Sequence, residues 1–144
     1  MGIRRKSREL ALQVLYQEEL TGQPDFFNFD GFCAHFQANK KAIPYARQLL
    51  EGVQNKKAEI NQLISRYAEN WRLERMSVID RNILRLAVFE LHYQEDVPTS
   101  VAINEAVEIA KRYATDESGP FINGILDAMA KAEDFADRKI KKTI

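Results

Sequence analysis

The pattern of apolar positions centres on the stretch Ser77–Tyr93, which reads SVIDRNILRLAVFELHY. On a helix that turns roughly 100° per residue, its apolar side chains cover nearly the whole circumference. They leave one polar seam, which is lined by Arg81, Arg85 and His92. A helix that is apolar almost all round packs against neighbours on several sides. We therefore predict that this stretch is the central helix of the fold.

Two acidic residues, Asp80 and Glu90, fall within the apolar arc rather than on the polar seam. A buried carboxylate is costly without a partner, so each must meet a cation, a helix N-terminus or a second protein. For Glu90 the residues alone favour a structural ion pair over a functional role.

Apolar residues at steps of three and four predict further helices along the chain. Asn70–Met76 interrupts this period, so we place a subdomain boundary there and expect Trp71 to be buried at the junction. The last helix is expected to have Ser118 as its cap and Pro120 in its first turn. The other predicted helices are Arg4–Leu20, a short one near Asp30–Ala38, Ile43–Tyr67 and Ser100–Ala114.

No strand pattern, repeat or low-complexity linker is apparent in the sequence. The predicted fold is all-α, with about six or seven helices in a single domain of residues 1–144. This domain is expected to consist of a helical half at about 1–70, a second half at about 71–137 and a basic tail at 138–144.

The formal net charge of zero conceals a separation of charge along the chain. Residues 1–8 and 138–144 together carry +8 and contain no acid, whereas the residues between them carry −8. Basic ends indicate a polyanionic partner, most often nucleic acid. An acidic body indicates that any second partner is a basic protein. The alternative for each end is a solvated tail, and we favour that alternative for the C-terminal one.

Several classes of protein are disfavoured by what the sequence lacks. It has no apolar run of membrane-spanning length and no secretory signal, and its single cysteine, Cys33, suits a reducing cytosol. It also has no Gly-rich phosphate loop, no His/Cys spacing typical of a metal site and no nucleophile elbow. We therefore expect no catalytic residues, no cofactor and no metal. The residues alone favour a cytosolic helical adaptor whose basic N-terminal arm contacts RNA.

The first predicted helix carries a second face beside its core stripe. Leu12 and Tyr16 are four residues apart on this face, together with Arg5 and close to Arg8. An aromatic residue beside arginines suits contact with RNA or protein, and the alternative is that Leu12 and Tyr16 cover a neighbouring helix. Because Arg5 and Arg8 lie off the core stripe, replacing them is expected to cost little stability.

Four segments occur in an order that resembles the NusB family of transcription antitermination factors. An arginine-rich start leads into ELALQVLY and is followed by VIDRNILRLAVFEL, VPTSVAINEAVEIAKRY and FINGILD. Each motif alone is weak, and together they are specific. The resemblance covers nearly the whole chain and is strongest from Val78 to Asp127, whereas Gln23 to Lys41 carries no matching motif.

The resemblance implies an all-α fold of two helical halves and a role without catalysis. Members of this family form a complex with NusE, a small-subunit ribosomal protein that is also a Nus factor. The pair binds the boxA element of nascent RNA and couples it to RNA polymerase with other Nus factors, chiefly during ribosomal RNA transcription. The implied location is the cytoplasm, with no membrane partner.

The resemblance also implies roles for individual residues. Tyr16 and Asp80 match positions at the NusE interface, which would give Asp80 an external partner. The arginine-rich start and the loop before the last helix match the RNA surface, although Glu117 and Gly119-Pro120 depart from the family pattern in that loop. The residues implied in RNA binding are Arg4, Arg5, Lys6, Arg8, Asp116, Glu117, Ser118 and Phe121.

Two alternatives remain open from the sequence. NusB-like domains also precede ribosomal RNA cytosine methyltransferases, but such an enzyme needs a nucleotide-cofactor domain with a Gly-rich turn, and residues 1–144 contain none. The other alternative is a purely structural helical homodimer, since family members are either monomers or dimers.

Overall fold

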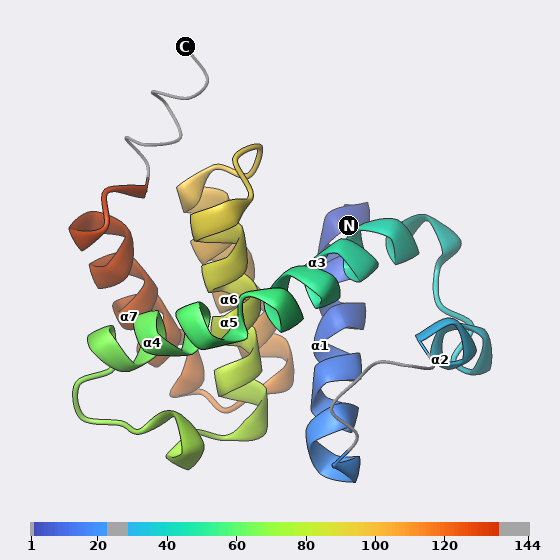
Figure 1. Ribbon diagram of the computed structural model, residues 1–144, viewed down its shortest axis with the longest axis horizontal. Coiled ribbons are helices and arrows are strands. Elements are labelled where there is room, and N and C mark those ends of the chain that lie inside the picture. The colour runs from blue at the N-terminus through green and yellow to red at the C-terminus, as the bar shows by residue number, and fades with distance from the viewer. Residues whose placement is uncertain (1, 23–28, 136–144) are drawn as a thin grey trace.

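The computed structural model describes residues 2–22 and 29–135, and these residues form helices with no strand among them. The all-α prediction is confirmed (Figure 1). The predicted basic tail at 138–144 lies outside the described residues. The elements are α1 (Ile3–Thr21), α2 (Phe29–His35), the 3-10 helix η1 (Lys40–Ala42), α3 (Ile43–Asn55), α4 (Lys57–Tyr67), the 3-10 helix η2 (Leu73–Arg75), α5 (Val78–Tyr93), α6 (Thr99–Tyr113) and α7 (Ser118–Ala132).

Helix α5 lies at the centre of the molecule, as its pattern predicts. It packs against α1, α3, α4, α6 and α7 (Figure 1), and every residue from Asn82 to Leu91 is buried. Ser77 caps its N-terminus, because the Ser77 hydroxyl accepts a hydrogen bond of 3.0 Å from the Asp80 N–H. Such a cap satisfies one of the N–H groups that have no partner within the helix.

The single long helix predicted for Ile43–Tyr67 is instead two helices, α3 and α4, which are separated at Lys56. The Lys56 backbone leaves the helical region at φ −112° and ψ 17°, although its carbonyl still accepts a hydrogen bond from the Ile60 N–H. All six residues from 54 to 59 are exposed, so this part of the helical stripe has no buried side chain, and Lys56 and Glu59 contact only Tyr93 at the surface of α5 among the contacts described. The two helices remain close to one line in Figure 1.

Gly52 allows α3 to cross α5 at close range. A β-carbon at this position would lie 2.1 Å from the Cζ atom of Phe89, which is far closer than two carbon atoms can approach. The crossing therefore depends on the missing side chain of Gly52.

Two local predictions are wrong at the lower end of the molecule in Figure 1. Trp71 is 55% exposed rather than buried, because the loop that carries it runs outside the helices. Its ring meets the half-buried ring of Phe121 edge to face. Ser118 is the first residue of α7 rather than its cap, and its buried hydroxyl lies 3.1 Å from the Thr115 hydroxyl. Pro120 does lie in the first turn of α7, as predicted.

Helices α1 and α6 run side by side in the same direction, and this arrangement positions the candidate site. Arg5 pairs with Glu105 near the start of α1, and Glu9, one turn later on α1, pairs with Arg112, two turns later on α6. Within residues 2–22 and 29–135, no helix is long and apolar enough to cross a membrane.

Candidate nucleic-acid interface

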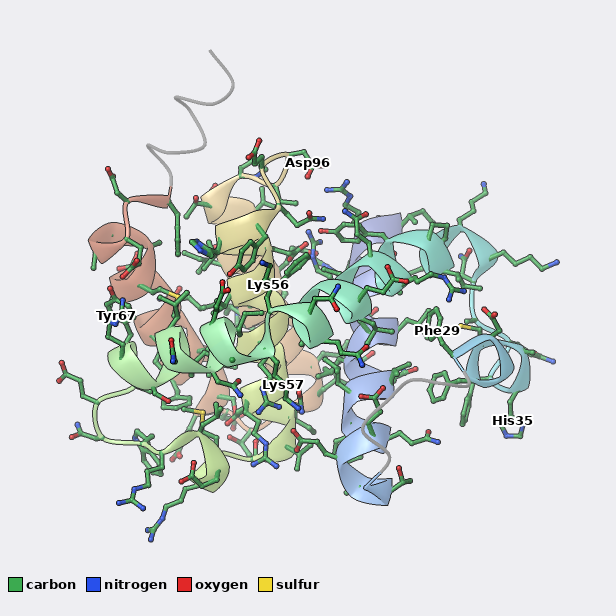
Figure 2. All side chains as sticks on the ribbon, in the orientation of Figure 1. Phe29, His35, Lys56, Lys57, Tyr67 and Asp96 are labelled. Carbon is green, nitrogen blue, oxygen red and sulfur yellow. The ribbon has the colours of Figure 1, made fainter. Side chains whose placement is uncertain are left out.

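The basic residues at the start of α1 lie at the upper end of the molecule in Figure 1. The Nη2 atom of Arg4 donates a 2.7 Å hydrogen bond to Asp96, which Figure 2 labels at the turn between α5 and α6. The Arg4 guanidinium carbon also lies 4.3 Å from the centroid of the Tyr45 ring. Arg4 remains 46% exposed at its side chain, so it can still reach an external phosphate.

Arg5 is held by Glu105 of α6 through two parallel hydrogen bonds. Its Nε atom lies 3.0 Å from Oε1 and its Nη2 atom lies 2.5 Å from Oε2. This forked geometry fixes the guanidinium more firmly than a single contact would. Lys6, in contrast, is exposed and has no carboxylate within ion-pair distance among the described residues.

Arg8 is buried, and the prediction that it lies on an exposed face is wrong. Its side chain is only 6% exposed, and its Nε atom lies 2.9 and 3.0 Å from the two carboxylate oxygens of Glu90. The Tyr45 hydroxyl donates a third hydrogen bond to Glu90. Burial and the Glu90 charge raise the pKa of Tyr45 well above its ordinary value, so this hydroxyl keeps its proton. The predicted structural ion pair of Glu90 is confirmed, and Arg8 is its partner.

The remaining residues implied in RNA binding lie at the opposite end of α6. Asp116 and Glu117 are exposed in the loop, Ser118 is buried, and Phe121 is half-buried in the first turn of α7. Arg4 meets Asp96 just before α6 and Arg5 meets Glu105 within it, so the two groups are separated by roughly 12 to 22 Å along the 15-residue axis of α6. The structure therefore does not bring them to one point, but places them at the two ends of one face.

A surface hollow between α1 and α6 lies between these two ends. Its volume is about 200 Å³. The hollow contains both cations and acids, so its charge is mixed rather than uniformly basic. Its lining residues are Arg5, Glu9, Glu108, Ile109, Lys111 and Arg112.

Tyr16 and Asp80, the positions implied in NusE binding, lie on adjoining helices at the lower end of the molecule. Glu19, three residues after Tyr16, forms ion pairs with Arg81 and Arg85 of α5, and this contact joins the end of α1 to the start of α5. Tyr16 is 39% exposed, and the Oδ1 atom of Asp80 is buried without a hydrogen-bond partner among the described residues. Leu12 is buried, so for this residue the alternative of covering a neighbouring helix is correct.

Sequence reasoning missed the carboxylates that hold the basic arm. Asp96 and Glu105 pair with Arg4 and Arg5, although they lie about a hundred residues away in the chain. The helical spacing of the acids on α6 was the available signal, but it pointed equally well to pairs within that helix.

Stability should fall at acidic pH through Glu105. The hydrogen bond from Arg5 lowers the pKa of Glu105 below its ordinary value of 4.5 despite the opposing effect of burial. The unfolded chain therefore takes up this proton first, and the stabilisation is complete above about pH 4.5 and is lost as the pH falls through the folded-state pKa. We expect Glu105→Gln to unfold more easily than the wild type at pH 7, and the difference to shrink below pH 4.5 in urea titrations. A difference that stays constant with pH would contradict this expectation.

These features define a class of protein: a small all-helical binding domain with a basic helix end on one face and, on another, an exposed tyrosine and a half-buried carboxylate. Residues 5–131 match the model of the NusB family. The chain belongs to the NusB family.

Relatives of known name agree over most of the chain. The transcription antitermination protein NusB of Desulfosudis oleivorans is 49% identical over 134 residues, which cover 91% of this chain and 87% of the relative. NusB of Thermotoga maritima has a solved structure with a TM-score of 0.84 and 42% identity, and the match covers 96% of both chains. A crystal structure of the antitermination factors NusB and NusE in complex with double-stranded RNA matches with a TM-score of 0.81 and 30% identity, covering 92% of this chain and 98% of the other.

Proposed function

We propose that this protein is a transcription antitermination factor that acts as an RNA-binding adaptor. In this role it binds boxA RNA together with NusE and couples that RNA to RNA polymerase and other Nus factors. The names of its relatives and the complex of NusB, NusE and RNA support this role. A protein that works on nascent bacterial RNA acts in the cytoplasm, which suits its buried free thiol, Cys33. The role requires no catalytic step, cofactor or metal.

The observation that carries the RNA-binding part is the face formed by α1 and α6. Its upper end presents Arg4 and Lys6, both exposed, and Arg5, which Glu105 holds in place. From this end the hollow between the two helices leads toward the loop before α7. We place the phosphates on the exposed cations and the bases along the hollow, since phosphate contacts position a nucleic acid and base contacts select it. Arg8 is buried and is not part of this surface. It contacts Glu105, which in turn holds Arg5 in place.

The second surface, around Tyr16 and Asp80, is proposed for NusE. A ribosomal protein is generally basic, and Asp80 offers it a carboxylate whose Oδ1 atom has no hydrogen-bond partner within the described parts of the chain. That oxygen is buried in the free protein, so a bound cation would reach the half-buried carboxylate through the rest of its surface. This surface lies away from the basic arm, so RNA and NusE can bind at the same time.

The double variant Arg4→Ala/Lys6→Ala tests the RNA-binding surface. Each phosphate held on single-stranded RNA contributes roughly 0.7 to the slope of log affinity against log salt. If each side chain holds one phosphate, the slope should flatten by about 1.4 in titrations of boxA RNA at several salt concentrations. NusE binding should persist, because Tyr16 and Asp80 are unchanged.

The matched control is Lys56→Ala/Lys57→Ala, which removes two exposed cations at the junction of α3 and α4, where Figure 2 labels them. This control should keep the wild-type slope. If the arm variant also kept the wild-type slope and affinity, the basic arm would not be the RNA site. If NusE left the affinity of the wild type for boxA RNA unchanged, the adaptor role itself would be refuted.

A further inference from the structure

Trp71 is exposed to an extent that is unusual for a tryptophan. Its side chain lies in the loop between α4 and η2, and more than half of its surface is in contact with solvent. An indole has a large apolar surface that normally finds cover in the core or at an interface. An exposed tryptophan on a well-packed molecule therefore indicates a contact with another molecule.

Two arginines beside Trp71 distinguish this site from the rest of the surface. Arg72 and Arg75 are exposed and have no ion-pair partner among the described residues. Every other arginine in the described ranges has a carboxylate within ion-pair distance. Within those ranges, Arg72 and Arg75 are therefore the arginines that no carboxylate neutralises, and their guanidinium groups can bind an external anion.

Trp71 also adjoins a residue of the proposed RNA surface. Its ring meets the ring of Phe121 edge to face, with centroids 6.0 Å apart and an interplanar angle of 78°. Phe121 lies in the first turn of α7, directly after the loop of Asp116–Ser118. The Trp71 site therefore continues the proposed RNA surface beyond the lower end of α6.

We propose that Trp71 is a stacking platform for one unpaired RNA base, and that Arg72 and Arg75 hold the neighbouring phosphates. Unstacked bases are commonly bound on aromatic rings, and arginine guanidinium groups bind phosphate in a forked geometry. This inference rests on the proposed RNA-binding function and adds a second contact region to it.

The two guanidinium groups at this site, rather than its net charge, favour RNA over a basic protein. The acids of the same segment, Glu69 and Glu74, balance Arg72 and Arg75, so the segment has no net charge to attract either partner from a distance. The binding then depends on stacking and on directed contacts from the guanidinium groups. A basic ribosomal protein would leave both guanidinium groups without an anion, whereas an RNA backbone supplies one for each.

Trp71 is the sole tryptophan of the chain, so the tryptophan fluorescence of the protein reports on this site alone. When boxA RNA is titrated into the full-length protein, base stacking should quench the tryptophan fluorescence with the same midpoint as the anisotropy of labelled RNA. Trp71→Ala should weaken RNA binding by about 5- to 150-fold, the range found for the loss of one stacked base. Trp71→Phe should recover most of the affinity, because phenylalanine keeps an aromatic face.

Control variants test whether the effects are specific to Trp71 and to the two arginines beside it. Phe36→Ala removes another exposed aromatic ring, near α2, and should leave RNA affinity unchanged. Arg72→Ala/Arg75→Ala should flatten the salt slope by about 1.4, whereas Arg66→Ala, whose arginine pairs with Glu133, should not change it.

Two results would overturn the proposal while leaving the RNA-binding function intact. One is wild-type RNA binding with unchanged tryptophan fluorescence and full affinity in Trp71→Ala. The other is loss of NusE binding in Trp71→Ala with RNA affinity unchanged, which would identify a protein contact. If the wild type bound no RNA with or without NusE, the proposed function and this inference would both fail.

Discussion

Replacing Arg8 with alanine is expected to lower the free energy of unfolding by about 3 to 5 kcal/mol, the usual cost of removing one partner of a buried ion pair. The substitution leaves the Glu90 carboxylate, which is 2% exposed, with only the Tyr45 hydroxyl among the partners described above. It also removes one of the two arginines that hold Glu105. Urea denaturation followed by circular dichroism at pH 7 measures this cost.

Two variants test the cause of this destabilisation. Arg4→Ala removes a neighbouring arginine whose ion pair is exposed, and it should cost less than about 1 kcal/mol. Arg8→Met/Glu90→Leu removes both charges and replaces them with apolar groups, so it should recover much of the loss, because buried pairs are often replaceable as a unit. A loss below 1 kcal/mol for Arg8→Ala would mean that the charge of Glu90 is compensated by other groups.

Asp80→Lys is expected to weaken NusE binding by about two orders of magnitude or more, since placing like charges across an interface costs several kcal/mol. The substitution should cost little in stability. Asp80 lies in the first turn of α5, where a lysine loses a favourable interaction with the helix dipole worth up to about 1 kcal/mol. Isothermal titration with purified NusE measures the affinity, and the helical circular dichroism spectrum should stay unchanged.

The matched control for charge reversal is Glu51→Lys. Glu51 is an exposed acid on α3, away from the proposed NusE surface, and its reversal changes the net charge of the protein by the same amount. The control should keep NusE affinity. If both variants weakened binding equally, the effect would come from the overall charge of the body rather than from Asp80.

The central helix could be predicted from the sequence because its signal is entirely local. The apolar residues of Ser77–Tyr93 surround the helix axis, and only a helix covered on several sides can bury them. Glu90 illustrates the limit of such reasoning. Its position inside the apolar arc required a partner, but the choice of Arg8 depends on how α1 crosses α5, which no periodicity within either helix records.

The wrong predictions for Arg8 and Trp71 have the same physical origin, because the burial of both residues depends on how separate segments pack. A helical wheel places Arg8 off the core stripe of α1, yet a second layer formed by α5 and α6 covers that side and supplies carboxylates to it. Trp71 is apolar enough to be buried, but the loop that carries it lies outside the helices. The roles of Tyr16 and Asp80 in binding NusE come from the family resemblance, because no periodicity in the sequence indicates which partner a surface binds, and they stay predictions.

The crossing of α3 and α5 at Gly52 has a consequence for the history of the family. Because any β-carbon at residue 52 would overlap the Phe89 ring, the sizes of residues 52 and 89 cannot vary independently. A relative that acquires a side chain at position 52 must shrink residue 89 or move the two helices apart, and a wider spacing would open a void beside the central helix. The two positions should therefore change together among descendants of a common ancestor, so that an alignment of the family would show them as a correlated pair.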